Sequence, residues 1–461
     1  SSDLNHKLHV AFFPWTAFGH MIPFLELANQ IALRGHKVTF ISTPINIQRL
    51  LQNASTSLSS SIEFLKLSLS NNKDLPPHAE ATSDLEFHHV PFLKNAVDFL
   101  EGEISSFLNT SKPDWILYDF NSYWVPSIAK NAGVSCGFYN IISSWTVCMF
   151  GSSPQGLMTG TERVKHEDYI SPPSWVPFPT NLSYREYEAK NMFKGVADDV
   201  SGVTDGYRLG MAILGSDLLV SRSNYEVDGE WIKLLGDLHK KPVVAAGLLP
   251  PLGDGNCGRN EWSEINKWLD KWDKGTVVYI ALGSEAPLTQ EVVDEFAFGV
   301  ELCGFPFFWS YKVPKSSITL PEGYIKRTCD RGLVWDRWAP QVNVLAHQAI
   351  GCFLTHCGWG SLIEGLAFGR PLVMLPCFLD QGLNSRFFEG KKVGVEVARN
   401  EDDGLFTKEG IVDALNKVMT KNKDNVYLEN ALKIQQVIGG KELHDKYIDD
   451  LIKVLKKTEN N

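Results

Sequence analysis

The feature that most constrains this chain is a repeated alternation of short apolar runs with segments of helical periodicity. Residues 9–14 (HVAFFP) and 37–42 are apolar runs of strand length, and 22–33 has the period of a helix. This order continues to the end of the chain, and it predicts parallel sheets covered by helices, an α/β fold. Further strands are expected in the segments 114–120, 276–283, 305–310, 333–335, 351–355 and 371–376, and further helices in 261–270, 290–302, 361–368 and 442–457.

The length of the chain predicts more than one domain. At about 150 residues per domain, 461 residues correspond to two or three domains, and the alternation divides best into two units. Tandem prolines and several glycines mark 241–260 as an interdomain linker. We therefore expect an N-terminal domain over 1–240 and a C-terminal domain over 261–440. A last helix within 441–461 is expected to pack back toward the first domain, and 152–206 to form a long loop region with short helices.

Composition excludes several classes of protein. With 44 Lys and Arg against 54 Asp and Glu, the net charge is −10, which is unfavourable for binding nucleic acid. No run of 18 apolar residues is present, so no membrane-spanning helix is expected. The 8 cysteines contain no C-x-x-C pair, a pattern typical of reduced thiols in the cytoplasm rather than of disulfides or zinc. We expect a cytoplasmic monomer.

The densest cluster of chemically useful residues lies in 338–381. Within it, 355–361 (THCGWGS) ends a strand, turns on glycines and begins a helix near Ser361. Free backbone N–H groups and the positive helix end then lie at the carboxyl edge of a strand, an arrangement that binds phosphate. The same residues have a structural alternative, because Ser361 and Glu364 form the S-x-x-E pattern of a capping box.

The residues around this turn match the parts of a nucleotide sugar. Trp338 offers a flat stacking face, and Gln341 an amide that can read the edge of a base. Glu364 can accept two ribose hydroxyls, and Asp380 and Gln381 can bind the hydroxyls of a sugar. The alternatives are a core position for Trp338 and a helix N-cap for Asp380.

The block resembles the signature of the plant secondary-product UDP-glycosyltransferases, and the chain resembles that family along nearly its whole length. The residues that carry the resemblance are Trp338, Gln341, His347, His356, Gly358, Trp359, Ser361, Glu364, Pro371, Asp380 and Gln381. The resemblance implies the GT-B architecture, in which two Rossmann-like domains with parallel sheets face a central cleft. The C-terminal domain would hold the UDP-sugar and the N-terminal domain the acceptor.

The resemblance also assigns roles within the block. Trp338, next to Ala339, would stack on uracil, Gln341 would hydrogen-bond it, and Glu364 would bind the ribose. The diphosphate would be held by backbone and side chains of His356, Gly358, Gly360 and Ser361, with Ser284 from the ALGSE turn. The sugar would contact Trp359, Asp380 and Gln381.

Position 360 departs from the family pattern. The family usually has Asn where this chain has Gly360, and Gly resembles the subgroup that extends a sugar already attached to a terpenoid or flavonoid. FPWTAFGH near the start and PDWILYDF also resemble that branch, which includes diterpene glycoside 1,2-glucosyltransferases. Gln381 is usually associated with UDP-glucose, but the branch also contains rhamnosyltransferases. UDP-rhamnose as donor, and a bare aglycone as acceptor, therefore stay open.

A catalytic base is expected in the N-terminal half. His20 follows the first strand and Asp119 ends a later one, so both fall at a carboxyl edge. An imidazole held by a carboxylate can take a proton from a hydroxyl. The residues alone leave a satisfied turn histidine as an alternative, and the resemblance identifies them as the family's His–Asp pair. It implies inversion at the anomeric carbon. No Asp-x-Asp occurs, so neither a metal nor another cofactor is expected.

An apolar acceptor would need an aromatic cleft. Segments expected to border it contribute Phe18, Phe120, Tyr123, Trp124, Trp145, Met149, Tyr207, Phe378 and Leu379. Each of these side chains has core packing as its alternative.

Four other functions are alternatives for this sequence. A Rossmann oxidoreductase needs G-x-G-x-x-G after the first strand, and FPWTAFGH does not supply it. A non-catalytic nucleotide-sugar-binding protein would not need His20 and Asp119. A metal-binding module would centre on His356 and Cys357. A glycosidase requires paired carboxylates in one pocket, for which the sequence gives no signal.

Overall fold

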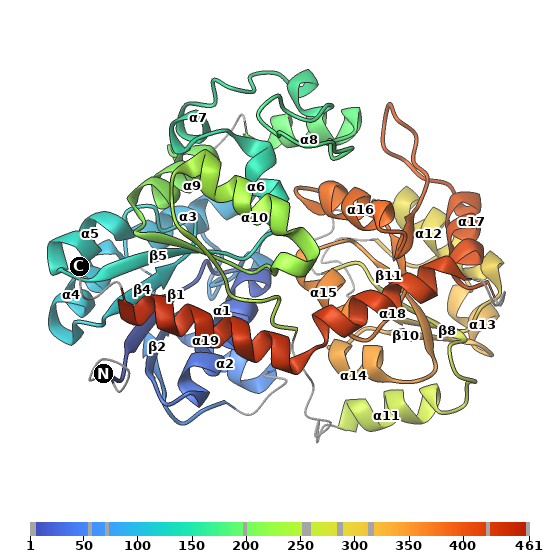
Figure 1. Ribbon diagram of the computed structural model, residues 1–461. Helices are drawn as coiled ribbons and strands as arrows, with labels where there is room; N and C mark the ends of the chain where they lie inside the picture. The colour runs from blue at the N-terminus through green and yellow to red at the C-terminus, as the bar shows by residue number, and fades with distance from the viewer. Residues whose placement is uncertain are drawn as a thin grey trace.

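The computed structural model describes residues 6–53, 58–69, 73–196, 201–250, 260–283, 289–311, 318–420 and 425–457. Within these ranges the chain forms two sheets in which every strand pairing is parallel. The N-terminal sheet has seven strands in the order β3-β2-β1-β4-β5-β6-β7, and the C-terminal sheet has six in the order β10-β9-β8-β11-β12-β13. The expected α/β fold with two parallel sheets is confirmed (Figure 1).

The strands are short and mostly buried, as the apolar runs predict. Those of the N-terminal sheet are β1 His9–Phe13, β2 Lys37–Ser42, β3 Ile62–Lys66, β4 Trp115–Tyr118, β5 Ser135–Asn140, β6 Leu218–Ser221 and β7 Val243–Ala245. Those of the C-terminal sheet are β8 Val277–Ala281, β9 Phe307–Ser310, β10 Gly332–Trp335, β11 Ile350–Thr355, β12 Leu372–Met374 and β13 Gly394–Glu396.

Helices connect the strands and pack on the sheets. The N-terminal half contains α1 Phe18–Leu33, α2 Pro44–Asn53, α3 Val90–Asp98, α4 Glu101–Ser111, α5 Val125–Ala132, α6 Ser144–Phe150, α7 Pro154–Thr159, α8 Glu186–Val196, α9 Asp205–Gly215 and α10 Tyr225–His239. The C-terminal half contains α11 Asn260–Leu269, α12 Gln290–Cys303, α13 Tyr324–Thr328, α14 Gln341–Ala346, α15 Trp359–Ala367, α16 Gln381–Gly390, α17 Lys408–Val418 and α18 Val426–Ile438. The last helix is α19 Lys441–Lys457. No helix in the described ranges is both long and apolar enough to span a membrane.

Two helices begin earlier than the sequence predicts, and both differences matter for the site. Helix α1 starts at Phe18 rather than at 22, so His20 lies in its first turn and not in the preceding loop. Helix α15 starts at Trp359 rather than at 361, after an extended N-cap residue, Gly358. Ser361 is therefore inside the first turn, and the capping box that was its structural alternative is wrong.

The stretch 241–260 is not linker throughout. Strand β7 lies inside it and pairs with β6 through Leu219↔Val243 and Ser221↔Ala245, so the N-terminal sheet extends into the expected linker. Residues 251–259 lie outside the described ranges.

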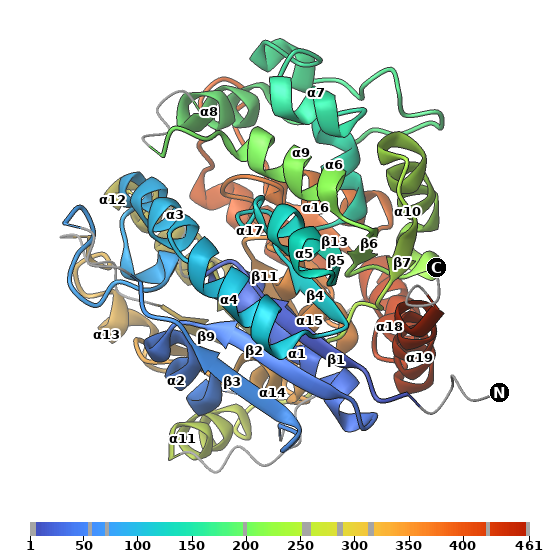
Figure 2. The ribbon, with the colours of Figure 1, turned by 90° about the vertical axis from the view of Figure 1, so that its left-hand side faces the viewer.

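Helix α19 returns to the N-terminal half. Figures 1 and 2 both show it beside the N-terminal sheet, near α1. The Trp115 indole N–H donates to the Leu455 carbonyl at 3.0 Å, and Arg34 on α1 pairs with Asp445 at 2.8 Å. Leu451 belongs to the same buried cluster as Val10 on β1. Apolar packing and ion pairs therefore hold the last helix, which follows α18 of the C-terminal half, against the N-terminal half.

Replacing Leu451 with Ala is expected to lower the free energy of unfolding by about 2–5 kcal/mol, because Leu451 is fully buried and truncation leaves a cavity. Leu432→Ala on the exposed side of α18 is the control and is expected to change it by less than about 0.5 kcal/mol. Thermal and denaturant unfolding measure both variants. Equal losses in the two variants would show that α19 does not depend on this contact.

Candidate active site

The carboxyl edge of the N-terminal sheet carries a histidine–aspartate pair. Strands β1 and β4 are neighbours with Phe13 opposite Tyr118, so the residues that follow each strand emerge side by side. His20 Nδ1 lies 2.7 Å from Asp119 Oδ2, and the Trp15 backbone N–H donates to the same oxygen at 3.1 Å. This bond selects the tautomer in which Nδ1 carries the proton and Nε2 the lone pair. The assignment suits a general base.

Asp119 is held firmly by its surroundings. Its side chain is 2% exposed, and Oδ1 accepts a hydrogen bond from the Phe120 backbone N–H at 2.8 Å. The ring of half-buried Phe120 lies 5.8 Å from the His20 ring. An acceptor that reaches His20 would therefore meet an aromatic surface next to the imidazole.

In the C-terminal half, hydrogen bonds link three polar side chains, two of which are expected to bind the nucleotide. The Tyr279 hydroxyl donates to Gln341 Oε1 at 3.0 Å, and Gln341 Nε2 donates to Glu364 Oε2 at 2.7 Å. Glu364 is thus bonded to Gln341 and does not complete a capping box. Trp338 is 45% exposed, so the core alternative for it is wrong.

His356 lies between two glycines. A Cβ atom added at Gly283 would lie 2.8 Å from His356 Nε2, and one at Gly358 would lie 2.6 Å from it, so only glycine fits at either position. Burial lowers the pKa of His356 to about 4, so its imidazole is neutral near pH 7 and offers a single N–H. Ser284, expected beside it, lies outside the described residues.

The expected sugar-binding residues open α16. Asp380 occupies the N-cap position of this helix, but its side chain makes no capping hydrogen bond. It accepts instead from Asn384 Nδ2 at 2.9 Å. Gln381 Oε1 accepts from the backbone N–H groups of Cys377 and Phe378 at 2.8 and 3.2 Å. The amide NH₂ of Gln381 is then the group available to a ligand.

Asn384 also ties the two halves together, and the sequence analysis missed it. Its Oδ1 accepts from Ser143 Oγ at 3.0 Å and from Trp145 Nε1 at 3.1 Å, both in the N-terminal half. Its Nδ2 also donates to the Cys357 carbonyl at 3.2 Å, next to His356. The spacing of one helical turn after Asp380 was the signal that could have found it.

The dyad and the donor residues meet across the two halves. Burial raises the pKa of Asp380, while its hydrogen bond from Asn384 and the nearby charge of His20 lower it. His20 from α1 and Asp380 from α16 are therefore close enough for their charges to interact. The Trp359 indole is buried and donates to the Arg222 carbonyl at 3.2 Å, so the backbone N–H is what remains at 359 for a sugar.

The expected acceptor residues divide into two groups. Phe18, Phe120, Tyr123 and Phe378 are partly exposed, and Tyr207 and Leu379 are exposed. Trp124, Trp145 and Met149 belong to the hydrophobic core, and the prediction is wrong for them. Trp145 has no exposed surface because it stacks on Phe387 at 3.8 Å and meets Trp359 edge-on at 5.1 Å.

Comparisons with known proteins decide the family. Residues 253–447 match the family model "UDP-glucoronosyl and UDP-glucosyl transferase". UDP-glycosyltransferase 91D1 of Stevia rebaudiana is 44% identical and the alignment covers 99% of this chain and 94% of that protein. The chain belongs to the UDP-glycosyltransferase family. It is therefore a transferase, and the expectation drawn from 338–381 is confirmed.

Two further similarities agree with this assignment. Soyasaponin III rhamnosyltransferase of Glycine max is 41% identical, over 98% of this chain and 96% of that protein. The crystal structure of Glycyrrhiza uralensis UGT73P12 complexed with glycyrrhetinic acid 3-O-monoglucuronide has a TM-score of 0.80 at 20% identity, covering 98% of this chain and 96% of that one. The structural likeness shows the GT-B fold.

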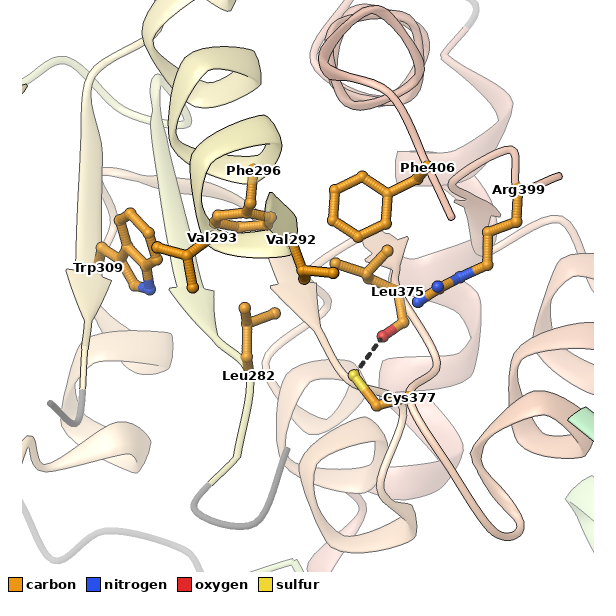
Figure 3. Close-up of a pocket in the computed structure, with 9 residues that line it drawn as sticks. All are labelled: Leu282, Val292, Val293, Phe296, Trp309, Leu375, Cys377, Arg399 and Phe406. Atoms are coloured by element: carbon orange, nitrogen blue, oxygen red, sulfur yellow. Dashed lines mark hydrogen bonds between the residues drawn. The ribbon is translucent and has the colours of Figure 1, made fainter. Parts of the chain in front are cut away.

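The glycosyltransferase also has an apolar pocket beside the site. Its lining includes Leu282 just after β8, Phe296 on α12, Trp309 on β9 and Phe406 just before α17 (Figure 3). None of the residues expected to bind donor or acceptor lines it. Within the described ranges, no group of three or more His, Cys, Asp or Glu side chains is arranged to hold a metal ion.

Glu26 on α1 is a second residue that the sequence analysis missed. Burial raises its pKa to about 7, with the charge of Arg222 lowering it and Glu364 raising it further. A carboxyl that is protonated when folded, but has a pKa near 4.5 when exposed, releases a proton on unfolding. Between these two values the free energy of unfolding therefore falls as pH rises.

Glu26→Gln is expected to remove this fall. Relative to wild type, the variant should gain up to about 3 kcal/mol of stability between pH 4.5 and pH 8, since each pKa unit corresponds to about 1.4 kcal/mol. Urea unfolding across this pH range measures the effect, with exposed Glu103→Gln as the control. Parallel stability curves for wild type and Glu26→Gln would contradict it.

Proposed function

We propose that this UDP-glycosyltransferase moves a sugar, glucose first among the candidates, from a UDP-sugar to the 2-hydroxyl of a sugar already attached to a terpenoid or flavonoid. The observation that carries the proposal is the His20–Asp119 pair, whose Nδ1 and Oδ2 atoms lie 2.7 Å apart, with Asp380 of the donor half close enough to interact with the charge of His20. A base and a sugar-binding carboxylate on opposite sides of one junction suit transfer between two bound molecules.

The reaction follows from this arrangement. His20 Nε2 takes the proton of the acceptor hydroxyl, and the resulting oxygen attacks the anomeric carbon. The bond from that carbon to the β-phosphate oxygen breaks, and its electron pair leaves with UDP. Attack opposite the leaving group inverts the centre, so an α-linked donor gives a β-glycoside. Asp119 stabilises the imidazolium that forms.

The donor would lie along α15 and the strands beside it. Trp338, with Ala339 beside it, would stack on uracil, and Gln341 and Glu364, already bonded to one another, would bind the base edge and the ribose. His356, Gly358, Gly360 and Ser361 would hold the diphosphate at the helix start, where backbone N–H groups are available. Asp380 and Gln381 would bind the sugar.

Gly360 and the relatives support an acceptor that already carries a sugar. Soyasaponin III rhamnosyltransferase is named for a saponin acceptor and for rhamnose. This name is the observation that favours UDP-rhamnose as the alternative donor, on the same acceptors. Glucosylation of a bare aglycone is the alternative on the acceptor side.

A transfer assay read by mass spectrometry distinguishes these alternatives. UDP-glucose and UDP-rhamnose would each be offered with terpenoid and flavonoid aglycones and with their monoglucosides. We expect disaccharide products from monoglucosides with UDP-glucose. Products from aglycones alone would overturn sugar-on-sugar transfer. A protein that binds no UDP at all would overturn the donor site.

His20→Ala is expected to lower kcat by roughly 10²- to 10⁴-fold, the usual contribution of a general base. Asp119→Asn should also lower kcat, because the amide no longer stabilises the imidazolium. UDP affinity should stay within about twofold of wild type in both, since neither residue contacts UDP. Calorimetry and initial rates measure the two effects.

Matched controls exist for both variants. His6 precedes β1 and so lies at the opposite edge of the sheet, and Asp237 is an exposed carboxylate of α10. His6→Ala and Asp237→Asn should retain full activity. Unchanged kcat in His20→Ala would remove it as the base.

A further inference from the structure

Gly360 leaves space in front of a single charged group. It lies in the first turn of α15, where the proposed function places the diphosphate. A Cβ atom built at Gly360 has one described neighbour within 4 Å, the Arg222 Nη1 atom at 3.5 Å. The guanidinium therefore comes from the other half of the molecule to the start of the donor helix.

The side chain and backbone of Arg222 are fixed on several sides. The residue follows β6 directly and is 3% exposed. Its backbone N–H donates to the Asn140 carbonyl at 2.9 Å, and its own carbonyl accepts from the Trp359 indole at 3.2 Å. Its Nε donates to the Leu248 carbonyl at 2.9 Å. These bonds hold the guanidinium in one place, with Nη1 toward α15.

The charge of Arg222 has only weak compensation from the protein. The acidic groups that act on it are Tyr139, Glu364 and Glu26, and in the described residues it forms no ion pair with any of them. Burial raises the pKa of Glu26 to about 7, so this carboxyl loses part of its negative charge near pH 7, and burial also raises the pKa of Glu364. A buried cation without a full counter-charge is costly, and a bound anion would remove that cost.

We propose that Arg222 binds the diphosphate of the UDP-sugar from the N-terminal half, and that Gly360 keeps open the space through which it does so. The inference rests on the proposed donor site. It adds a charged contact from the half that carries His20. The Arg222 carbonyl also accepts a hydrogen bond from Trp359. One residue therefore joins the two halves and balances the negative charge of the diphosphate.

The contact acts on the same bond that the transfer breaks. As the bond from the anomeric carbon to the β-phosphate oxygen breaks, its electron pair moves onto that oxygen and the proton of the acceptor moves to His20. A guanidinium beside the diphosphate offsets this negative charge, and guanidinium groups bind phosphate oxygens through two parallel N–H donors. No atom of Arg222 is transferred.

The first test compares UDP with uridine, which lacks the diphosphate. For Arg222→Gln, titration calorimetry should show Kd for UDP raised roughly tenfold, as expected for one charge-assisted contact, and Kd for uridine unchanged. Arg327→Gln, which removes a guanidinium paired with Glu301 on the surface, is the matched control and should change neither. Unchanged UDP affinity in Arg222→Gln, or equal losses for UDP and uridine, would overturn the inference.

Arg222→Lys keeps the charge without the planar fork and decides the question if Arg222→Gln does not fold. It should weaken UDP binding severalfold, leave uridine binding unchanged and retain more transfer activity than the Gln variant. If Arg222→Gln does not fold and Arg222→Lys binds UDP as tightly as wild type, the inference is overturned. If wild type binds no UDP, the proposed function fails first, and the Arg222 contact fails with it.

A second test examines the space at Gly360. An Asn side chain at position 360 would occupy the space next to Arg222 Nη1. The fold-losses in UDP affinity caused by Gly360→Asn and by Arg222→Gln should therefore not multiply in the double variant. We expect the double variant to bind UDP more tightly than the product of the single losses predicts. Strictly multiplicative losses would show that the two residues do not share this space.

Discussion

The hydrogen bonds of Asn384 are the interaction on which the rest of the site depends. A buried amide is costly unless its donors and acceptors are satisfied, and this one has four partners. Two of them, Ser143 and Trp145, lie in the N-terminal half, and two, Cys357 and Asp380, lie in the C-terminal half. The partners can all be satisfied only in one relative placement of the two sheet edges. That placement brings His20 and Asp380 to the same junction.

The apolar contacts around this amide stabilise the same placement. Trp145 stacks on Phe387 and meets Trp359 edge-on, so aromatic rings from both halves pack as one core. Arg386 on α16 also pairs with Glu188 on α8, across the same junction, at 2.5 Å. Helix α19, which follows α18 of the C-terminal half, packs on the N-terminal sheet. The reacting groups can thus come from two sheets, since the contacts around them fix their relative positions.

The sequence predicted the fold and the family well because both depend on local patterns. Apolar runs located the strands, and parallel strands place the residues that follow them at one edge, which is why His20 and Asp119 were found. The acceptor residues were harder to predict. Whether Trp145 lines a cleft or fills a core depends on Phe387, which is distant in sequence. Glu26 and Arg222 were missed for the same reason, because their partners lie on other elements, and for Asn384 only the contact with Asp380 is local.

The charges at the junction follow from what a nucleotide-sugar site has to bind. A diphosphate needs positive charge, but an empty buried site cannot hold several cations without counter-charges. This molecule supplies helix N–H groups, a neutral His356 and one buried guanidinium, with two carboxyls beside it whose pKa values burial raises. Carboxyls that can hold a proton allow the cation to stay in place without a tight ion pair. The positive charge of Arg222 is then available to a ligand. A fully paired arginine would first have to break its salt bridge.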